Sequence, residues 1–168
     1  MILELALLFV FPAAMAMAAA MDLLTMTIPN RISLALVAGF FVLAPLTGLG
    51  LTEMAVHLGV GLAMLLVGLL LFIPGWIGGG DAKLFAAVSL WVGLDQLLPY
   101  AVYASLLGGA LTIGFLALRM LPVPFGLTRY GWLARLHDPS NGIPYGIALA
   151  LAGLLVYPQT VWMSGLGN

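Results

Sequence analysis

Two aspartates are the residues of this chain best suited to do chemistry. Asp22 and Asp81 each lie at the edge of a nearly continuous apolar stretch, in a sequence that is 64% hydrophobic and only 7% charged. A carboxylate at membrane depth costs about 2.5–3.5 kcal/mol on insertion scales and usually serves a function. Two carboxyl groups that share one proton can hydrolyse a bond, because one activates water while the other polarises the carbonyl group. We therefore expect an acid pair, with the role of each member left open.

Three glycines, Gly78, Gly79 and Gly80, directly precede Asp81. Glycine permits backbone geometry and close approach that other residues forbid. Non-helical backbone at membrane depth is tolerated where it is buried in protein or lines a water-filled cavity. We expect the glycines to border such a cavity. We also expect Asp81 to lie near the start of the helix that follows, where the helix dipole favours a negative charge.

Apolar helices must position these acids, and a helix needs about 20 residues to cross the hydrocarbon core. Six stretches qualify or nearly do: residues 2–21, 32–49, 54–73, 76–94, 97–118 and 143–163. Turn residues separate them at 28–31, 47–50, 74–75 and 95–99. We predict an all-α polytopic membrane protein in which residues 1–168 form one domain, a bundle of six transmembrane helices with a polar loop at 119–142. The first stretch is interpreted as a retained span, because Glu4 stands where a signal peptide carries a basic residue.

The charges orient this bundle. Six crossings place all five basic residues on one face, namely Arg31, Lys83, Arg119, Arg129 and Arg135. The other face receives Glu4, Glu53 and Asp95. The positive-inside rule then predicts that the basic loops are cytoplasmic and that both termini are extracytoplasmic. The same topology brings Asp22 and Asp81 to matching depth at the cytoplasmic face.

The composition also limits partners and cofactors. A net charge of −1 gives no reason to expect a nucleic-acid partner. The absence of cysteine excludes disulfides and thiolate metal sites. His57 and His137 lack metal-ligand spacing, so we predict no metal and no cofactor. Membrane lipid is the expected surrounding partner, and the oligomeric state stays open.

Three motifs in this sequence resemble those of the type IV prepilin peptidases. Residues 78–84 match the family's GxGD motif, with Asp81 as the acid and Lys83 behind it. Asp22, followed shortly by Pro29 and Asn30, is similar to the first motif of the family. The third resemblance is at 143–148, where a Pro-Tyr-Gly segment opens the last span.

The resemblance implies an aspartyl intramembrane protease of the bacterial inner membrane. It would remove the short basic leader of pilin precursors at the cytoplasmic face, with Asp22 and Asp81 as the catalytic pair. The motif residues Gly78, Gly79, Gly80, Lys83, Pro29 and Asn30 would support that pair. Pro144, Tyr145 and Gly146 would either open the last helix or contact substrate.

The chain is most similar to the compact branch of the family, which serves tight-adherence, Flp-type pili. The larger branch carries an N-terminal domain with cysteine pairs and also methylates the new amino terminus. Because the first acid is at position 22 and cysteine is absent, methyltransferase activity is not expected. The archaeal preflagellin peptidases are built similarly and stay an alternative.

The same residues also allow alternative hypotheses about their roles. The acids could be interfacial helix caps in a non-enzymatic small transporter or assembly subunit. The presenilin-like GxGD proteases expect a Tyr-Asp motif, whereas Asp22 follows Met21. Pro29 and Asn30 are expected to end one helix and cap the next. Lys83 could anchor the helix at the interface, tune the acid pair or receive a substrate glutamate.

Overall fold

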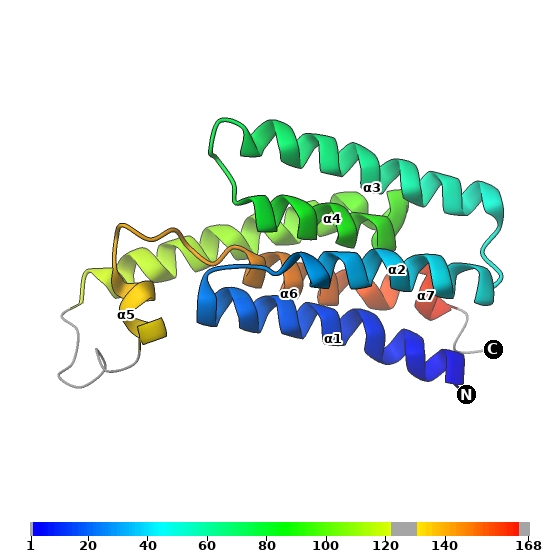
Figure 1. Ribbon diagram of the computed structural model, residues 1–168, viewed down its shortest axis with the longest axis horizontal. Helices are drawn as coiled ribbons and strands as arrows, with labels where there is room; N and C mark the ends of the chain where they lie inside the picture. The colour runs from blue at the N-terminus through cyan, green and yellow to red at the C-terminus, as the bar shows by residue number, and fades with distance from the viewer. Residues whose placement is uncertain (1, 122–130, 165–168) are drawn as a thin grey trace.

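The computed structural model describes residues 2–121 and 131–164, and every regular element in that part of the chain is helical. The elements are α1 (Ile2–Thr25), α2 (Asn30–Leu46), α3 (Leu51–Phe72), α4 (Gly79–Arg119), α5 (Gly131–His137), α6 (Gly146–Val156), the 3₁₀ helix η2 (Tyr157–Gln159) and α7 (Val161–Ser164). All except the short α5 lie lengthwise in one elongated bundle (Figure 1). The predicted all-helical class is confirmed.

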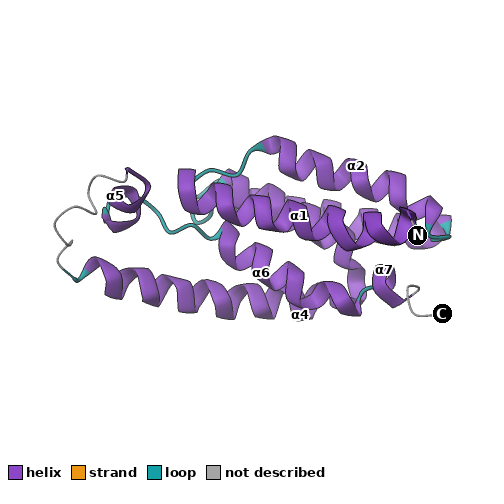
Figure 2. Ribbon diagram, turned by 90° about the horizontal axis from the view of Figure 1, so that it is seen from below, coloured by secondary structure: helices purple, strands orange, loops and turns teal. Residues whose placement is uncertain are grey.

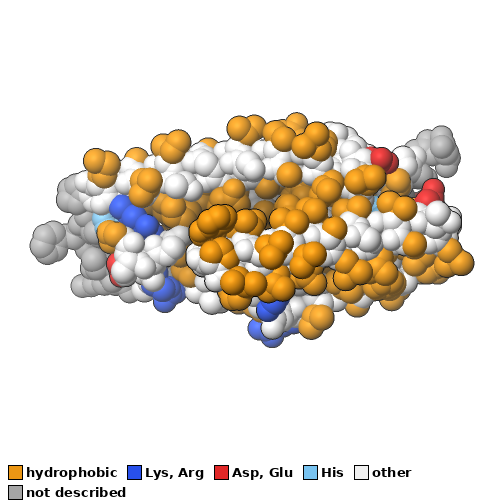
Figure 3. All heavy atoms as spheres, turned by 90° about the horizontal axis from the view of Figure 1, so that it is seen from above, with side chains coloured by type: hydrophobic (Ala, Val, Ile, Leu, Met, Phe, Trp, Pro, Cys, Tyr) orange, Lys and Arg blue, Asp and Glu red, His pale blue; other side chains and the backbone are white. Residues whose placement is uncertain are grey.

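Membrane-spanning length is met by four described helical segments. They are Ile2–Thr25, Leu51–Phe72, Gly79–Arg119 and Gly146–Ser164, while α2 is a shorter apolar helix. Large apolar side chains such as Leu62 (57% exposed) and Ile113 (71% exposed) cover the outside of the bundle. Figure 3 shows this hydrophobic covering over most of one face. Such a surface fits lipid rather than water, since soluble monomers rarely expose large apolar patches.

Helix α4 folds back on itself at Gly93. A straight helix of 41 residues would be about 60 Å long, twice the thickness of the hydrocarbon core. Gly93 has φ 68° and ψ −172°, a conformation that breaks the helix. Figure 1 shows arm 79–92 running in one direction and arm 94–119 returning beside it. The sequence predicts this turn at 95–99. That prediction is wrong, because the helix breaks at Gly93 and Pro99 lies inside the returning arm.

The break at Gly93 leaves backbone carbonyls that lipid cannot solvate. Nδ1 of the buried His57 donates a hydrogen bond to the carbonyl of Leu90 at 2.7 Å. The indole Nε1 of Trp162 donates to the carbonyl of Trp91 at 2.6 Å. A Cβ atom at position 93 would lie 2.6 Å from the His57 ring, so glycine also leaves the space that this ring occupies. His57 therefore has a structural role at the fold-back.

An aromatic cluster joins the helices at this end of the bundle. The Phe11 and Tyr157 rings stack with centroids 4.4 Å apart, and the Trp91 and Trp162 rings lie 4.8 Å apart. Phe40 from α2 contacts Trp162 edge-on at 5.5 Å. Helix α6 packs between α1 and α4 (Figure 2). The last span is therefore the central element, in contact with both helices that carry the two aspartates.

Several predicted boundaries need correction. Helix α1 continues to Thr25, so Asp22 lies inside its last turn rather than beyond its end. The last span begins at Gly146 rather than at 143. Tyr157–Gln159 interrupts that span as a 3₁₀ helix, because Pro158 cannot donate a backbone hydrogen bond.

The predicted polar loop at 119–142 contains the short helix α5 (Gly131–His137). This seven-residue helix is compatible with the prediction of a polar interval without one continuous helix. Arg129 and Tyr130, assigned to the same loop, lie outside the described residues.

Candidate active site

Asp22 and Asp81 line one cavity of about 330 Å³. It lies where α1 ends and α4 begins, at the end of the bundle that carries α5 (Figure 1). Asp22 is buried, with 5% of its surface exposed, and Asp81 is partly exposed in the first turn of α4. Both side chains border the same space, although they come from opposite ends of the region that separates α1 from α4 in the sequence. The fold thus brings together the two acids that the sequence singled out.

Gly146 holds the Asp22 side chain in place. Its backbone N–H, at the start of α6, donates a hydrogen bond to Asp22 Oδ2 at 2.7 Å. The first amides of a helix have no partner within the helix, so this one is free to bind a carboxylate. A Cβ atom at position 146 would lie 2.8 Å from the same oxygen and 2.5 Å from Cδ1 of Ile28. Only glycine fits this contact without movement of its neighbours.

The glycine triplet lets the chain pass close to the second acid. Gly78 is the N-cap of α4 in an extended conformation, and a Cβ atom there would lie 2.7 Å from Asp81 Oδ2. Gly80 lies in the first turn, where a Cβ atom would come within 3.1 Å of Cβ of Ile28. All three glycines border the cavity, as expected from the sequence. Two of them, Gly79 and Gly80, are nevertheless helical.

Met26 and Thr27 also line the cavity and were not singled out from the sequence. Met26 has φ 56°, a left-handed conformation that is rare for residues other than glycine. Its N–H donates to the carbonyl of Asp22 at 2.8 Å and so closes the last turn of α1. Strained backbone conformations of this kind occur more often at functional sites than elsewhere. No sequence signal identifies it, because methionine is not a residue type that favours the left-handed conformation.

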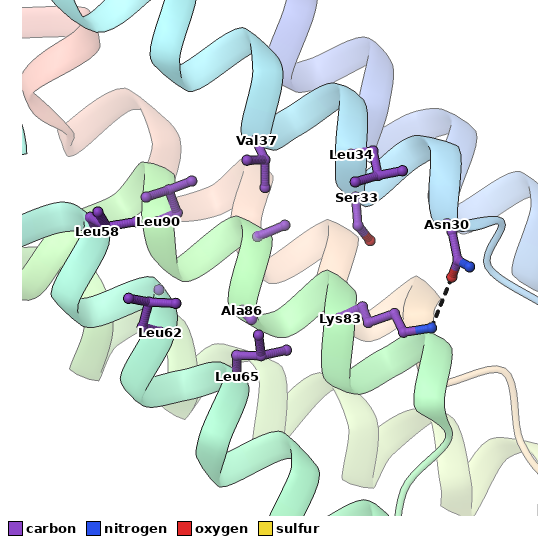
Figure 4. Close-up of a pocket in the computed structure, with 12 residues that line it drawn as sticks. Asn30, Ser33, Leu34, Val37, Leu58, Leu62, Leu65, Lys83, Ala86 and Leu90 are labelled. Atoms are coloured by element: carbon purple, nitrogen blue, oxygen red, sulfur yellow. Dashed lines mark hydrogen bonds between the residues drawn. The ribbon is translucent and has the colours of Figure 1, made fainter.

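Lys83 points away from this cavity. Its Nζ donates a hydrogen bond to Oδ1 of Asn30 at 2.9 Å, as drawn in Figure 4. Both residues line a separate, mostly apolar cavity of about 340 Å³ between α2, α3 and α4. Pro29 and Asn30 were expected together to end one helix and cap the next; Pro29 is the N-cap of α2, and Asn30 is the first residue of that helix. The Asn30 side chain binds Lys83 instead, which ties the start of α2 to α4.

The Pro-Tyr-Gly segment joins the last span to the returning arm of α4. Pro144 is buried, and the Tyr145 hydroxyl donates to the carbonyl of Ala104 at 3.1 Å. The Tyr145 ring lies directly against Gly108, where any Cβ atom would overlap it. The Tyr145 side chain thus binds the returning arm of α4, while the neighbouring amide of Gly146 binds Asp22 at the end of α1.

Two arginines dock the described part of the 119–142 segment over the same end of the bundle. Nη2 of Arg135 donates to the carbonyl of Leu24, one of the last residues of α1, at 2.6 Å. Arg119 at the end of α4 donates to the carbonyls of Leu136, Asn141 and Gly142. Helix α5 is thereby fixed beside the cavity that holds the acids.

Within 2–121 and 131–164, no group of three or more His, Asp or Glu side chains gathers as it would around a metal ion. Asp138, on the described surface beyond α5, accepts hydrogen bonds from the amide and hydroxyl of Ser140, which lower the pKa of its carboxyl. Among the described residues that line the cavity, the side chains with polar groups are Asp22, Asp81 and Thr27.

The model of the type IV leader peptidase family matches residues 9–113, which is more than half of the chain. That stretch includes Asp22, Asp81 and Lys83, and it ends before the Pro-Tyr-Gly segment. Neither the curated proteins nor the solved structures contain a match to this chain.

Proposed function

This chain belongs to the type IV leader peptidase family, and we propose that it is an aspartic endopeptidase that cleaves within the membrane interface. Membership makes it a leader-peptidase-like hydrolase and implies a pilin precursor as substrate. The finer proposal is that it removes the basic leader of Flp-type prepilins at the cytoplasmic face. The observation that carries it is the single cavity lined by Asp22 and Asp81.

The proposed mechanism uses the two carboxyls as one unit. Like charges at short range do not both ionise cheaply, so the pair holds one proton. The ionised member takes a proton from water, which attacks the scissile carbonyl while the protonated member donates to its oxygen. The amide of Gly146 keeps Asp22 oriented toward the cavity during this exchange. Either aspartate can fill either role.

The proposed topology counts the two arms of α4 separately and includes α2, which gives six crossings. In support, α1 begins and α7 ends at the same end of the bundle (Figure 1). Lys83, Arg119 and Arg135 lie toward the opposite end, near the acid pair. Figure 3 shows basic side chains toward that end and near the middle of this face; acidic side chains lie at the other end, and one lies beside the basic group. By the positive-inside rule, the acid pair then faces the cytoplasm of a bacterial inner membrane.

We propose no N-methyltransferase activity. The methylating branch of the family builds an additional domain with cysteine pairs, and this sequence has no cysteine. Cleaved product should therefore keep an unmodified amino terminus even when a methyl donor is supplied.

Cleavage of a purified pilin precursor in detergent tests the proposal. Asp22→Asn and Asp81→Asn should each lower the rate at least about a thousandfold, because members of a catalytic unit fail together. Folding should persist, since a neutral isostere replaces a costly buried charge. The matched control is Asp95→Asn. Asp95 is in the returning arm of α4 and lines a different cavity with Glu53 and His57, so this variant should cleave the precursor at the wild-type rate.

Each alternative predicts a different result. Substantial activity in either dyad variant would end the acid-pair hypothesis. Cleavage of a preflagellin but not a pilin precursor would indicate the archaeal-type activity. A wild-type protein that is folded and cleaves neither would favour a non-enzymatic role.

A further inference from the structure

A groove separate from the acid pair lies between α2, α3 and α4. Helices α2 and α3 each pack against α4 but make few contacts with each other, so the first arm of α4 forms the floor of the space between them. The groove follows residues 30–37, 58–65 and 83–90, which is about 10 Å along each helix. Leu34 and Leu62 at its rim are 66% and 57% exposed, so the groove opens on the apolar outside of the bundle.

The polar side chains of this groove gather at one end. Lys83 Nζ uses one of its three N–H groups to bind Oδ1 of Asn30, and no described carboxylate pairs with this cation. Ser33 lies one turn further along α2 and is only 8% exposed. Its hydroxyl points into the groove and makes no hydrogen bond to a described residue (Figure 4). A buried hydroxyl in this state is rare in native proteins and points to a ligand.

The chemistry of this end suits an anion. The remaining N–H groups of Lys83, the side-chain amide of Asn30 and the hydroxyl of Ser33 are all hydrogen-bond donors. The N-terminus of α2 lies beside them, and its N-cap, Pro29, provides no side-chain acceptor for the first amides. A helix N-terminus and a lysine both favour a phosphate group, which accepts several hydrogen bonds at once.

The rest of the groove suits a slender apolar chain. Its remaining lining is hydrophobic, and Gly61, Ala86 and Ala87 leave space along the floor. A helix is about 10–12 Å across with its side chains, so a 10 Å length of one fills about 800 Å³. That is more than twice the cavity volume of about 340 Å³. A phosphate at one end and an acyl chain along the floor are the two parts of a phospholipid.

We propose that this groove binds one anionic phospholipid, with its phosphate at Lys83, Asn30 and Ser33 and one acyl chain between α2, α3 and α4. The lipid supplies the negative charge that no described carboxylate offers to Lys83. It also joins α2 to α3, which make few contacts of their own. The inference does not require peptidase activity.

Thermal unfolding of the full-length protein in lipid-depleted, nonionic detergent tests the proposal. Dioleoylphosphatidylglycerol should raise the melting temperature by at least about 4 °C, because a ligand that binds only the folded state stabilises it. Dioleoylphosphatidylcholine, which has no net charge, should have less than half of this effect. Glycerol phosphate at the same concentration should have none, because it lacks an acyl chain. Equal effects of the two lipids, or an equal effect of glycerol phosphate, overturn the proposal.

Two pairs of variants test the two ends of the groove. Lys83→Met should raise the phosphatidylglycerol concentration for half of the effect at least about fivefold. Arg31→Met, which removes a neighbouring cation that does not line the groove, should respond like the wild type. Val37→Phe fills the groove and should abolish the response, whereas Val42→Phe, at an exposed position outside the groove on the same helix, should keep it. Equal responses within either pair overturn the proposal.

The absence of cysteine permits a second measurement in which the three polar groups stay intact. Leu62→Cys places a thiol in the groove, and Leu66→Cys places one a turn away outside it, where the leucine is also 57% exposed. Phosphatidylglycerol should slow the reaction of N-ethylmaleimide at position 62 at least about threefold and leave position 66 unchanged. Equal rates with and without lipid at position 62 overturn the proposal. Protection of position 62 by a pilin precursor but not by the lipid would assign the groove to substrate and would overturn it as well.

Discussion

The backbone N–H of Gly146 and Oδ2 of Asp22 form a 2.7 Å hydrogen bond between residues 124 positions apart. This contact links the motif that opens the last span to the first aspartate. It explains why glycine follows Pro144 and Tyr145, since a side chain at 146 would collide with the carboxylate that the amide holds. The Pro-Tyr-Gly motif thus positions one member of the acid pair, although it lies far from both aspartates in the sequence.

Gly146→Ala should impair cleavage through Asp22. The added Cβ would lie 2.8 Å from Oδ2, so the carboxylate must move out of its hydrogen bond. We expect a loss of about tenfold or more in kcat, because misplaced catalytic groups are costly. Rates per folded protein should be compared with Gly109→Ala, a helical position where nothing lies within 4 Å of a new Cβ. The control should be as active as wild type and slightly more stable; equal activity in the two variants would contradict the positioning of Asp22 by Gly146.

Gly93→Ala should destabilise the fold-back of α4. The residue has φ 68°, which costs about 1–3 kcal/mol for a side chain, and its Cβ would meet the His57 ring at 2.6 Å. Gly75→Ala is the control, because that glycine has φ 80° with open space around it. Thermal unfolding in detergent should show a larger loss for position 93. His57→Ala should recover part of the difference, and the absence of recovery would mean that His57 does not limit this site.

Lys83→Met should have a modest effect on both stability and cleavage. Lys83 binds Asn30 at an exposed site, and such pairs contribute about 1 kcal/mol or less. Asn30→Ala should match it, and the double variant should equal either single one, because one contact is lost in all three. Cleavage assays should therefore show losses of less than about fivefold.

The earlier alternatives for Lys83 predict other patterns. A much larger loss in Lys83→Met than in Asn30→Ala would restore a direct role for the cation. Selective loss on a precursor that carries a glutamate after the cut would indicate substrate recognition. Equal loss on both precursors with a shifted pH optimum would indicate an effect on the acid pair.

Arg119→Lys should loosen the segment that follows α5. Arg119 reaches the carbonyls of Leu136, Asn141 and Gly142 with its forked guanidinium. A lysine ammonium offers no rigid planar fork, so it cannot replace this geometry. Limited proteolysis from the cytoplasmic side of inverted vesicles should cut at 138–142 several times faster in the variant. Arg31→Lys is the control and should be cut at the wild-type rate; equal rates in both would mean that Arg119 does not hold this segment.

Much of the fold could be read from the sequence, because span length and hydropathy are local properties. The apolar stretches, the break at Thr47–Gly50 and the placement of Asp81 in the first turn of its helix all follow from neighbouring residues. The fold-back at Gly93 could not be predicted in this way. It depends on side chains of two other helices, His57 and Trp162, which bind backbone carbonyls at the end of the first arm of α4. Asp95 and Pro99 look like stronger turn signals, yet both fit inside the returning arm.

The sequence by itself determined that two carboxyls lie near one face of an apolar bundle, because charge in such a chain is rare and its depth follows from counting spans. Only the tertiary structure decided what surrounds them. It placed the backbone amide of Gly146 against the carboxylate of Asp22 and turned the Lys83 side chain toward Asn30. These relationships depend on how α4 and α6 pack against α1 and α2, and helix packing is a contact between distant residues that leaves no periodic signal along the chain.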